Sequence, residues 1–258
     1  MKLWVGTSWK MNKTLTEALE FVADLRAFID GLDEGVDARV QPFVMPSFTV
    51  IRDVARALAD TPVLVGAQNM HWAERGPWTG EVSPLQVQDC GAGMVELGHS
   101  ERRTHFGETD DTVARKVEAA VRFGLTPLIC VGETFEQRQR GRTDDVLRAQ
   151  TEGALRLLTG AQRAAPILFA YEPVWAIGAG GTPATPEDAD ARQRHIKEVA
   201  GSVLAAQPPV LYGGSVNPGN AADLVACAHI DGVFVGRAAW SAQGYVELLT
   251  IAAEAAPC

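Results

Sequence analysis

The chain has 258 residues, of which 47% are hydrophobic and 21% are charged, and its formal net charge is −9 at pH 7. This composition is typical of a soluble globular protein, and no apolar run approaches the roughly 18 residues of a membrane span. Because the chain is acidic and has no long Lys/Arg cluster, we expect neither nucleic acid nor a membrane as a partner.

The start of the chain and its cysteines indicate the compartment. The sequence begins Met-Lys-Leu-Trp-Val-Gly-Thr and goes directly into a strand-like segment without a leader pattern, which predicts a cytoplasmic location. Cys90, Cys130, Cys227 and Cys258 show no C-x-x-C or other metal-ligand spacing. We therefore expect reduced thiols, with Cys130 buried, and no metal site.

Eight short, nearly continuous apolar runs predict parallel strands that are covered on both faces. In chain order they are Leu3–Gly6, Val40–Met45, Val63–Ala67, Met94–Leu97, Thr126–Val131, Ile167–Tyr171, Val210–Tyr212 and Gly232–Val235.

Helical patterns separate these runs. Leu19, Val22, Leu25 and Ile29 share one face of a predicted helix, as do Val113, Val117 and Val121 of another. Thr185, followed by proline, predicts a helix start.

The alternation of strands and helices predicts an α/β protein, a single closed (β/α)8 barrel over residues 1–258. The alternative is a doubly wound open sheet, which would usually carry G-x-G-x-x-G after the first strand. Thr7-Ser8-Trp9-Lys10 stands there instead, and no linker divides the chain. We therefore expect one barrel domain.

Polar residues follow several of the predicted strands, at the end where barrel enzymes carry their active sites. Lys10, His99 and Glu172 lie there, as do glycine-rich turns at Gly213-Gly214-Ser215 and Gly236. Glu172 is followed by a loop that starts with proline and ends in glycine. This pattern favours a general base beside a movable lid.

These motifs resemble those of the triosephosphate isomerase family over essentially the full chain, and the resemblance implies a TIM barrel. The matching segments are Ser8-Trp9-Lys10-Met11-Asn12, Gln68-Asn69, Trp78-Thr79-Gly80-Glu81, the run from Gly98 to Arg103, the run from Cys130 to Glu133, the run from Tyr171 to Gly178, the run from Tyr212 to Val216 and the run from Asp231 to Gly236.

The resemblance implies a proton transfer on a small phosphorylated sugar through an enediol. By this resemblance Glu172 is the base, His99 the neutral electrophile and Lys10 a fixed positive charge, with Glu101 near His99 as a partner of Lys10. A glutamate base paired with a neutral histidine is the known arrangement of this family, so these roles are inherited from it. Such chemistry needs neither a metal nor another cofactor.

Phosphate is expected on backbone N–H groups of glycine-rich turns, which present donors without side-chain obstruction. The predicted donors are Gly178 in the lid, Ser215 after Gly213-Gly214, and Gly236 with Arg237. The loop Trp78-Thr79-Gly80-Glu81 resembles the dimerisation loop of the family, whose threonine reaches the neighbouring site. This resemblance implies a homodimer.

Several positions depart from the usual family pattern. Ser8 replaces an asparagine, Arg237 replaces a second glycine, and the lid ends Ala179-Gly180-Gly181 instead of Thr-Gly-Lys. Serine removes a contact near the substrate carbonyl and opens space, while arginine adds a cation that can reach phosphate or an extra hydroxyl.

Two glycines in three residues should also loosen the lid hinge. Trp72 and Trp240 are expected to add bulk nearby.

The segments from Gly6 to Asn12 and from Val235 to Trp240 are similar to those of the branch of erythrulose-phosphate isomerases used in erythritol breakdown. We therefore favour L-erythrulose 1-phosphate as substrate, converted to D-erythrulose 4-phosphate.

The alternatives are a genuine glycolytic triosephosphate isomerase and a non-catalytic barrel that binds a sugar phosphate. A barrel lyase or synthase would need a Schiff-base lysine at a strand end or another acid–base pair, and neither is found.

Overall fold

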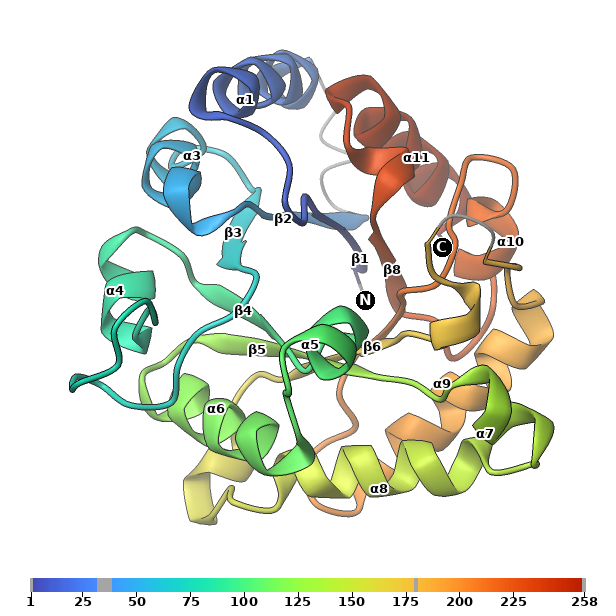
Figure 1. The fold of residues 1–258 in the computed structure, drawn as a ribbon. Coiled ribbons are helices and arrows are strands. Elements are labelled where there is room, and N and C mark those ends of the chain that lie inside the picture. Colours follow the sequence, from blue (N-terminus) through green and yellow to red (C-terminus); the bar gives the residue numbers. More distant parts are fainter. Residues whose placement is uncertain (1, 32–38, 179–180, 257–258) are drawn as a thin grey trace.

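A computed structural model describes residues 2–31, 39–178 and 181–256. Eight parallel strands pair in chain order and close into a barrel, around which the helices form a ring (Figure 1). The first and last strands close the ring, with Trp4 opposite Gly232 and Thr7 opposite Val235. The predicted closed barrel is therefore confirmed, and the open sheet is rejected.

All eight predicted strands are present, with bounds that shift by at most two residues. They are β1 Leu3–Ser8, β2 Val40–Met45, β3 Leu64–Ala67, β4 Met94–Leu97, β5 Thr126–Val131, β6 Leu168–Tyr171, β7 Val210–Tyr212 and β8 Gly232–Val235.

Helices and short 3₁₀ turns connect the strands. They are α1 Leu15–Asp30, η1 Phe48–Val50, α3 Ile51–Ala57, α4 Pro84–Asp89, α5 Ser100–His105, α6 Asp110–Arg122, α7 Phe135–Gln139, α8 Thr143–Leu155, η2 Gly160–Ala164, η3 Val174–Ala176, α9 Pro186–Gly201, α10 Ala221–Val225, η4 Arg237–Ala239 and α11 Ala242–Ala255.

The helices bury the faces that their sequences predict, with one exception. In α1, Val22 and Leu25 are buried, whereas Leu19 is 40% exposed because the buried stripe turns toward Ala18 and Phe21 instead. Thr185 caps α9 as predicted, since its side chain accepts a hydrogen bond from the Asp188 backbone N–H at 3.2 Å.

A hydrophobic cluster fills the interior of the barrel. Side chains alternate between the two faces of a strand, so every second residue points inward. The inward residues are Phe43, Met45, Met94, Leu128, Cys130, Leu168, Ala170, Leu211 and Phe234. Bulky residues fit because Gly6 leaves space for the Phe43 ring, which a Cβ atom there would meet at 1.9 Å.

The described cysteines and helices also bear on disulfides and on membrane spans. Cys90, Cys130 and Cys227 carry free thiols, and Cys130 is buried as predicted, while Cys258 lies outside the described residues. Within residues 2–31, 39–178 and 181–256, no helix combines the length and the apolar character needed to cross a membrane.

Candidate active site

The structure brings the three predicted catalytic residues together at the carboxyl ends of the strands. Lys10 follows β1, His99 follows β4 and Glu172 follows β6 directly. All three line one pocket of about 410 Å³. Residues from distant parts of the sequence thus meet because parallel strands end at the same rim of the barrel.

Glu172 is held in one orientation by close backbone packing. Its N–H donates to the Val131 carbonyl oxygen at 2.7 Å, and its side chain is only 3% exposed. A Cβ atom at Gly132 would lie 1.8 Å from the Glu172 carbonyl oxygen, and one at Gly213 would lie 2.9 Å from its Cγ. The two glycines therefore leave the space that this carboxylate occupies, and Ser100 N–H donates to its Oε2 at 3.3 Å.

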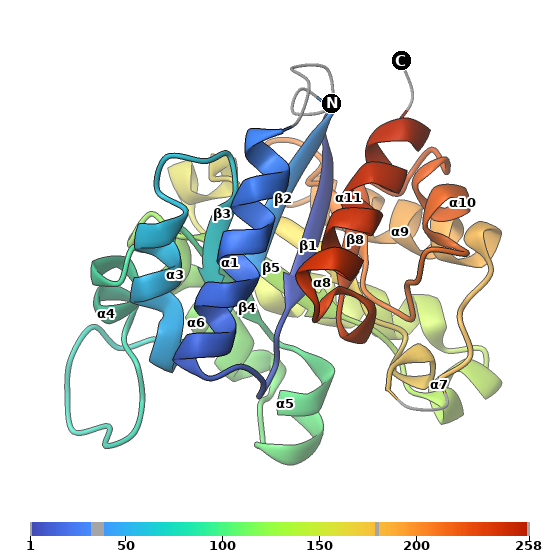
Figure 2. The same ribbon diagram turned by 90° about the horizontal axis from the view of Figure 1, so that it is seen from above.

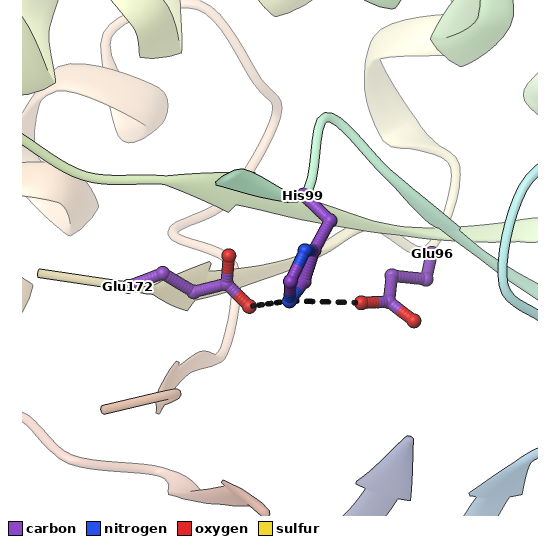
Figure 3. Close-up of side chains that lie close together, drawn as sticks. All are labelled: Glu96, His99 and Glu172. Atoms are coloured by element: carbon purple, nitrogen blue, oxygen red, sulfur yellow. Dashed lines mark ion pairs between the residues drawn. The ribbon is translucent and has the colours of Figure 1, made fainter. Parts of the chain in front are cut away.

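His99 precedes α5 and acts as its N-terminal cap. The backbone N–H of Glu101 donates to Nδ1 of His99 at 3.1 Å, so Nδ1 is an acceptor and the ring carries its proton on Nε2. Nε2 lies 3.4 Å from Oε1 of Glu172 and 3.8 Å from Oε1 of Glu96. The ring is therefore flanked by two carboxyl groups (Figure 3).

Lys10 pairs with Glu101, as predicted from the sequence. Its Nζ lies 2.6 Å from Oε1 of Glu101. The backbone of Lys10 has φ 52°, a left-handed conformation that is rare for residues other than glycine and that concentrates at functional sites. Gln68 stabilises this turn by donating to the Lys10 carbonyl oxygen at 3.0 Å.

Glu96 is a site residue that the sequence motifs do not single out. It lies inside β4, where all four residues are buried, and its carboxyl is 2% exposed. Ser8 donates a hydrogen bond from Oγ to Oε2 of Glu96 at 3.0 Å. The available signal was an acidic residue within an otherwise apolar strand, three positions before His99.

Burial raises the pKa of the Glu96 carboxyl to about 7, and the neighbouring Glu172 carboxylate adds to this rise. The His99 ring opposes this rise more strongly than Glu172 adds to it. The Ser8 hydroxyl and Lys10 lower the same pKa further, but burial outweighs them. Glu96 is therefore a carboxyl that changes its protonation near neutral pH within the candidate site.

Glu96, His99 and Glu172 also form the group that could hold a metal ion within the described part of the chain, since their ligand atoms lie within 4.8 Å of one another. The same atoms are the ones that proton transfer would use. The absence of a metal requirement stays a prediction.

The predicted phosphate donors line the same pocket, on the side of β6, β7 and β8. Gly178, with φ 87°, lies in the lid segment that follows β6. The remaining lining residues of this group are Gly213, Gly214, Ser215, Gly236 and Arg237.

Polar contacts tie down the two ends of the lid segment between Pro173 and Ala184. Trp175 donates from Nε1 to the buried Glu133 carboxyl at 2.8 Å, and the Ala184 N–H donates to the Tyr212 hydroxyl at 3.1 Å. The predicted loosening by Ala179-Gly180-Gly181 concerns Ala179 and Gly180, which lie outside the described residues.

The two tryptophans lie in different places. Trp240 lines the pocket, and its Nε1 donates to the Ser8 carbonyl oxygen at 3.0 Å. Trp72 instead stacks on His71, with ring centroids 4.0 Å apart, and packs near Trp78. The expectation that Trp72 adds bulk near the substrate is therefore wrong.

The sequence profile of the triosephosphate isomerase family matches residues 3–252. The chain belongs to the triosephosphate isomerase family. It is 61% identical to an L-erythrulose-1-phosphate isomerase of Mesorhizobium japonicum, with 95% of each chain covered. It is 57% identical to an L-erythrulose-1-phosphate isomerase of Rhizobium meliloti, with 98% of each chain covered.

A solved structure of the family has the same fold. The triosephosphate isomerase of Bartonella henselae superimposes with a TM-score of 0.83 and is 34% identical, and the match covers 97% of this chain and 99% of that one.

The Glu96 carboxyl should make stability depend on pH. Its pKa is 4.5 as an ordinary carboxyl and about 7 in the fold, so the folded state binds more protons between these values. The contribution of Glu96 to the free energy of unfolding is therefore fully present below pH 4.5. It is lost, by roughly 3 kcal/mol, as the pH rises through 7.

We expect Glu96→Gln to remove this loss, measured by urea unfolding between pH 5 and 8. Glu20→Gln, at an exposed position of α1, serves as the control and should keep the wild-type slope. Parallel curves for the wild type and Glu96→Gln would contradict the assignment.

Proposed function

We propose that this protein is a sugar-phosphate isomerase that interconverts L-erythrulose 1-phosphate and D-erythrulose 4-phosphate. The observation that carries the chemistry is the pairing of the Glu172 carboxylate with the Nε2 side of His99 at 3.4 Å, in a pocket that also contains Lys10. The substrate is supported by relatives at 57% and 61% identity that are named for it, against 34% for the triosephosphate isomerase of known structure.

Glu172 acts as the base in this proposal. Its carboxylate takes the proton from C3 of L-erythrulose 1-phosphate, next to the C2 carbonyl, and the electron pair forms an enediolate across C2 and C3. Glu172 then returns a proton to C2, while the hydroxyl proton of the C3 oxygen passes to the C2 oxygen through Nε2 of His99, which leaves the carbonyl on C3. Because the substrate and product differ by one shifted carbonyl, no other reactant is consumed.

His99 and Lys10 stabilise the charge that develops on oxygen. The Nε2 proton of His99 can donate to the oxygens on C2 and C3, since Nδ1 is already occupied as an acceptor. The Lys10 ammonium adds a positive charge, and Glu101 holds it at 2.6 Å. These groups are positioned before substrate arrives, which lowers the reorganisation that the reaction requires.

The phosphate is proposed to bind the lid and the turns after β7 and β8. Backbone N–H groups of Gly178, Ser215 and Gly236 are the donors, and Gly213-Gly214 allow the close approach. Arg237, which is exposed at the pocket rim, adds a cation for the phosphate.

A genuine triosephosphate isomerase is the competing candidate, because its reaction would use the same three residues. Ser8 favours the larger substrate, since its short side chain leaves space in the pocket wall. A non-catalytic sugar-phosphate-binding barrel is less well supported, because binding alone would not require the Lys10, His99 and Glu172 arrangement.

We predict a higher kcat/KM for L-erythrulose 1-phosphate than for dihydroxyacetone phosphate, and a loss of at least about a thousandfold in kcat for Glu172→Gln, since an amide cannot accept the proton. Both rates are measured with purified protein, and circular dichroism checks that the variant is folded. A wild-type preference for dihydroxyacetone phosphate would reject the four-carbon substrate. Unchanged kcat in Glu172→Gln would reject the base.

We also propose a homodimer in which the loop containing Thr79 enters the partner's site. This loop, between β3 and α4, extends away from the barrel (Figure 2). Beside the pocket, Met11 and Phe106 are 96% and 68% exposed, and they line a cavity of about 250 Å³ together with Lys10 and Glu101. Exposed apolar residues around a cavity are typical of an interface.

Sedimentation velocity should give about twice the 27.6 kDa of one chain. Phe106→Asp should shift the protein toward the monomer, because a carboxylate would be desolvated at the interface. Phe135→Asp, at a residue of α7 that is 53% exposed, is the matched control and should remain dimeric. A monomeric wild type, or a dimeric Phe106→Asp variant, would reject this interface.

A role in erythritol breakdown, which the resemblance implies, and a cytoplasmic location both stay predictions.

A further inference from the structure

The interior of the barrel contains one feature that the proposed chemistry does not use, the Glu96 carboxyl. Met94 belongs to the cluster that fills the barrel, and Glu96 stands two residues later on the same face of β4. Leu128, its neighbour on β5, belongs to that cluster as well. A carboxyl in such surroundings is costly unless a partner compensates for the lost water.

The protein supplies little of that compensation. Among the described residues, Ser8 Oγ is the donor that reaches Glu96, through Oε2. The other oxygen, Oε1, lies 3.8 Å from His99 Nε2, which is too long for a hydrogen bond. One carboxyl oxygen therefore faces the reacting groups with room for a ligand.

Space for that ligand lies beside it. Glu96 lines the cavity of about 250 Å³, whose exposed residues Met11 and Phe106 are the ones proposed to meet the partner's loop. Its buried residues Ser8 and His99 also line the pocket that contains Glu172, and the ligand needs only this buried end. Ser8 lines both spaces, and Glu96, to which its hydroxyl donates, lies next to the His99 ring (Figure 3 shows Glu96 on the side of the ring opposite Glu172).

The order of the strands sets the direction of a bound sugar phosphate. The proposed phosphate donors follow β6, β7 and β8, whereas Glu96 belongs to β4 and His99 follows it, four strands away from β8 in the ring of eight. A sugar phosphate whose phosphate binds these donors, and whose reacting carbons lie between Glu172 and His99, extends toward Glu96. The far end of a four-carbon ketose phosphate is a hydroxymethyl group.

We propose that Glu96 and Ser8 form the subsite for this terminal hydroxymethyl group and thereby select a four-carbon over a three-carbon substrate. This inference rests on the proposed function, and it names the residues that set its specificity. The hydroxyl of the ligand bonds Oε1 of Glu96, while Ser8 holds Oε2. A three-carbon ligand leaves Oε1 unbonded, and sites built to bond a hydroxyl discriminate strongly against analogues that lack it. The pKa of Glu96 near 7 lets this carboxyl donate or accept.

The test compares the binding of two polyol phosphates that cannot react, because they have no carbonyl group. Dissociation constants of erythritol 4-phosphate, as each enantiomer, and of glycerol 3-phosphate are measured by calorimetry. We expect Glu96→Val to weaken the better-bound erythritol phosphate by about 30-fold and glycerol 3-phosphate by less than about threefold.

Two variants and one control accompany it. Glu96→Gln retains hydrogen-bonding atoms and should keep part of the preference, and Ser8→Asn should reduce it by filling the space. Thr7→Val changes a buried polar residue of the same strand as Ser8 whose hydroxyl donates to the Ala239 carbonyl oxygen, and it should alter neither constant.

Equal weakening of both ligands by Glu96→Val, or no weakening of either, would overturn the subsite. Because neither ligand reacts, this result is independent of the rates. A wild type that turns over the triose phosphate faster would overturn the proposed substrate, and the binding constants alone would decide the role of Glu96.

Discussion

The hydrogen bond from the Glu101 N–H to Nδ1 of His99 sets the arrangement of the whole site. It caps α5 and makes Nδ1 of the ring an acceptor. The ring proton is therefore on Nε2, which lies between Glu172 and Glu96. The same residue, Glu101, holds Lys10 through its side chain. The start of one short helix thus positions His99 and Lys10, the proposed electrophile and the proposed fixed cation, together.

Glu172, the proposed base, depends on a different constraint, the close approach of backbones. Gly132 and Gly213 have no side chains, and this leaves the space in which the Glu172 carboxylate lies. Such precision suits a reaction in which one carboxylate takes a proton from one carbon and returns it to the next, since small displacements of a catalytic group are costly.

The sequence was sufficient for the barrel and for the residues that follow its strands. Near-continuous apolar runs predicted all eight strands, because buried parallel strands leave little room for polar residues. The resemblance supplied Lys10, His99, Glu101 and Glu172, and the structure places them together. Glu96 was missed because nothing local distinguishes an inward carboxyl from an outward one in a four-residue strand. Trp72 was misplaced because a loop carries no periodicity that could fix its direction.

We propose that Glu172 moves a proton between the two carbons that exchange the carbonyl. The most direct test runs the reaction with L-erythrulose 1-phosphate in D₂O and follows the ketose phosphates by NMR over many turnovers. We expect deuterium at the CHOH carbon of both ketose phosphates and none at their CH₂ groups, with no exchange in Glu172→Gln. Product that forms without deuterium at this carbon, or equal exchange in the variant, would contradict it.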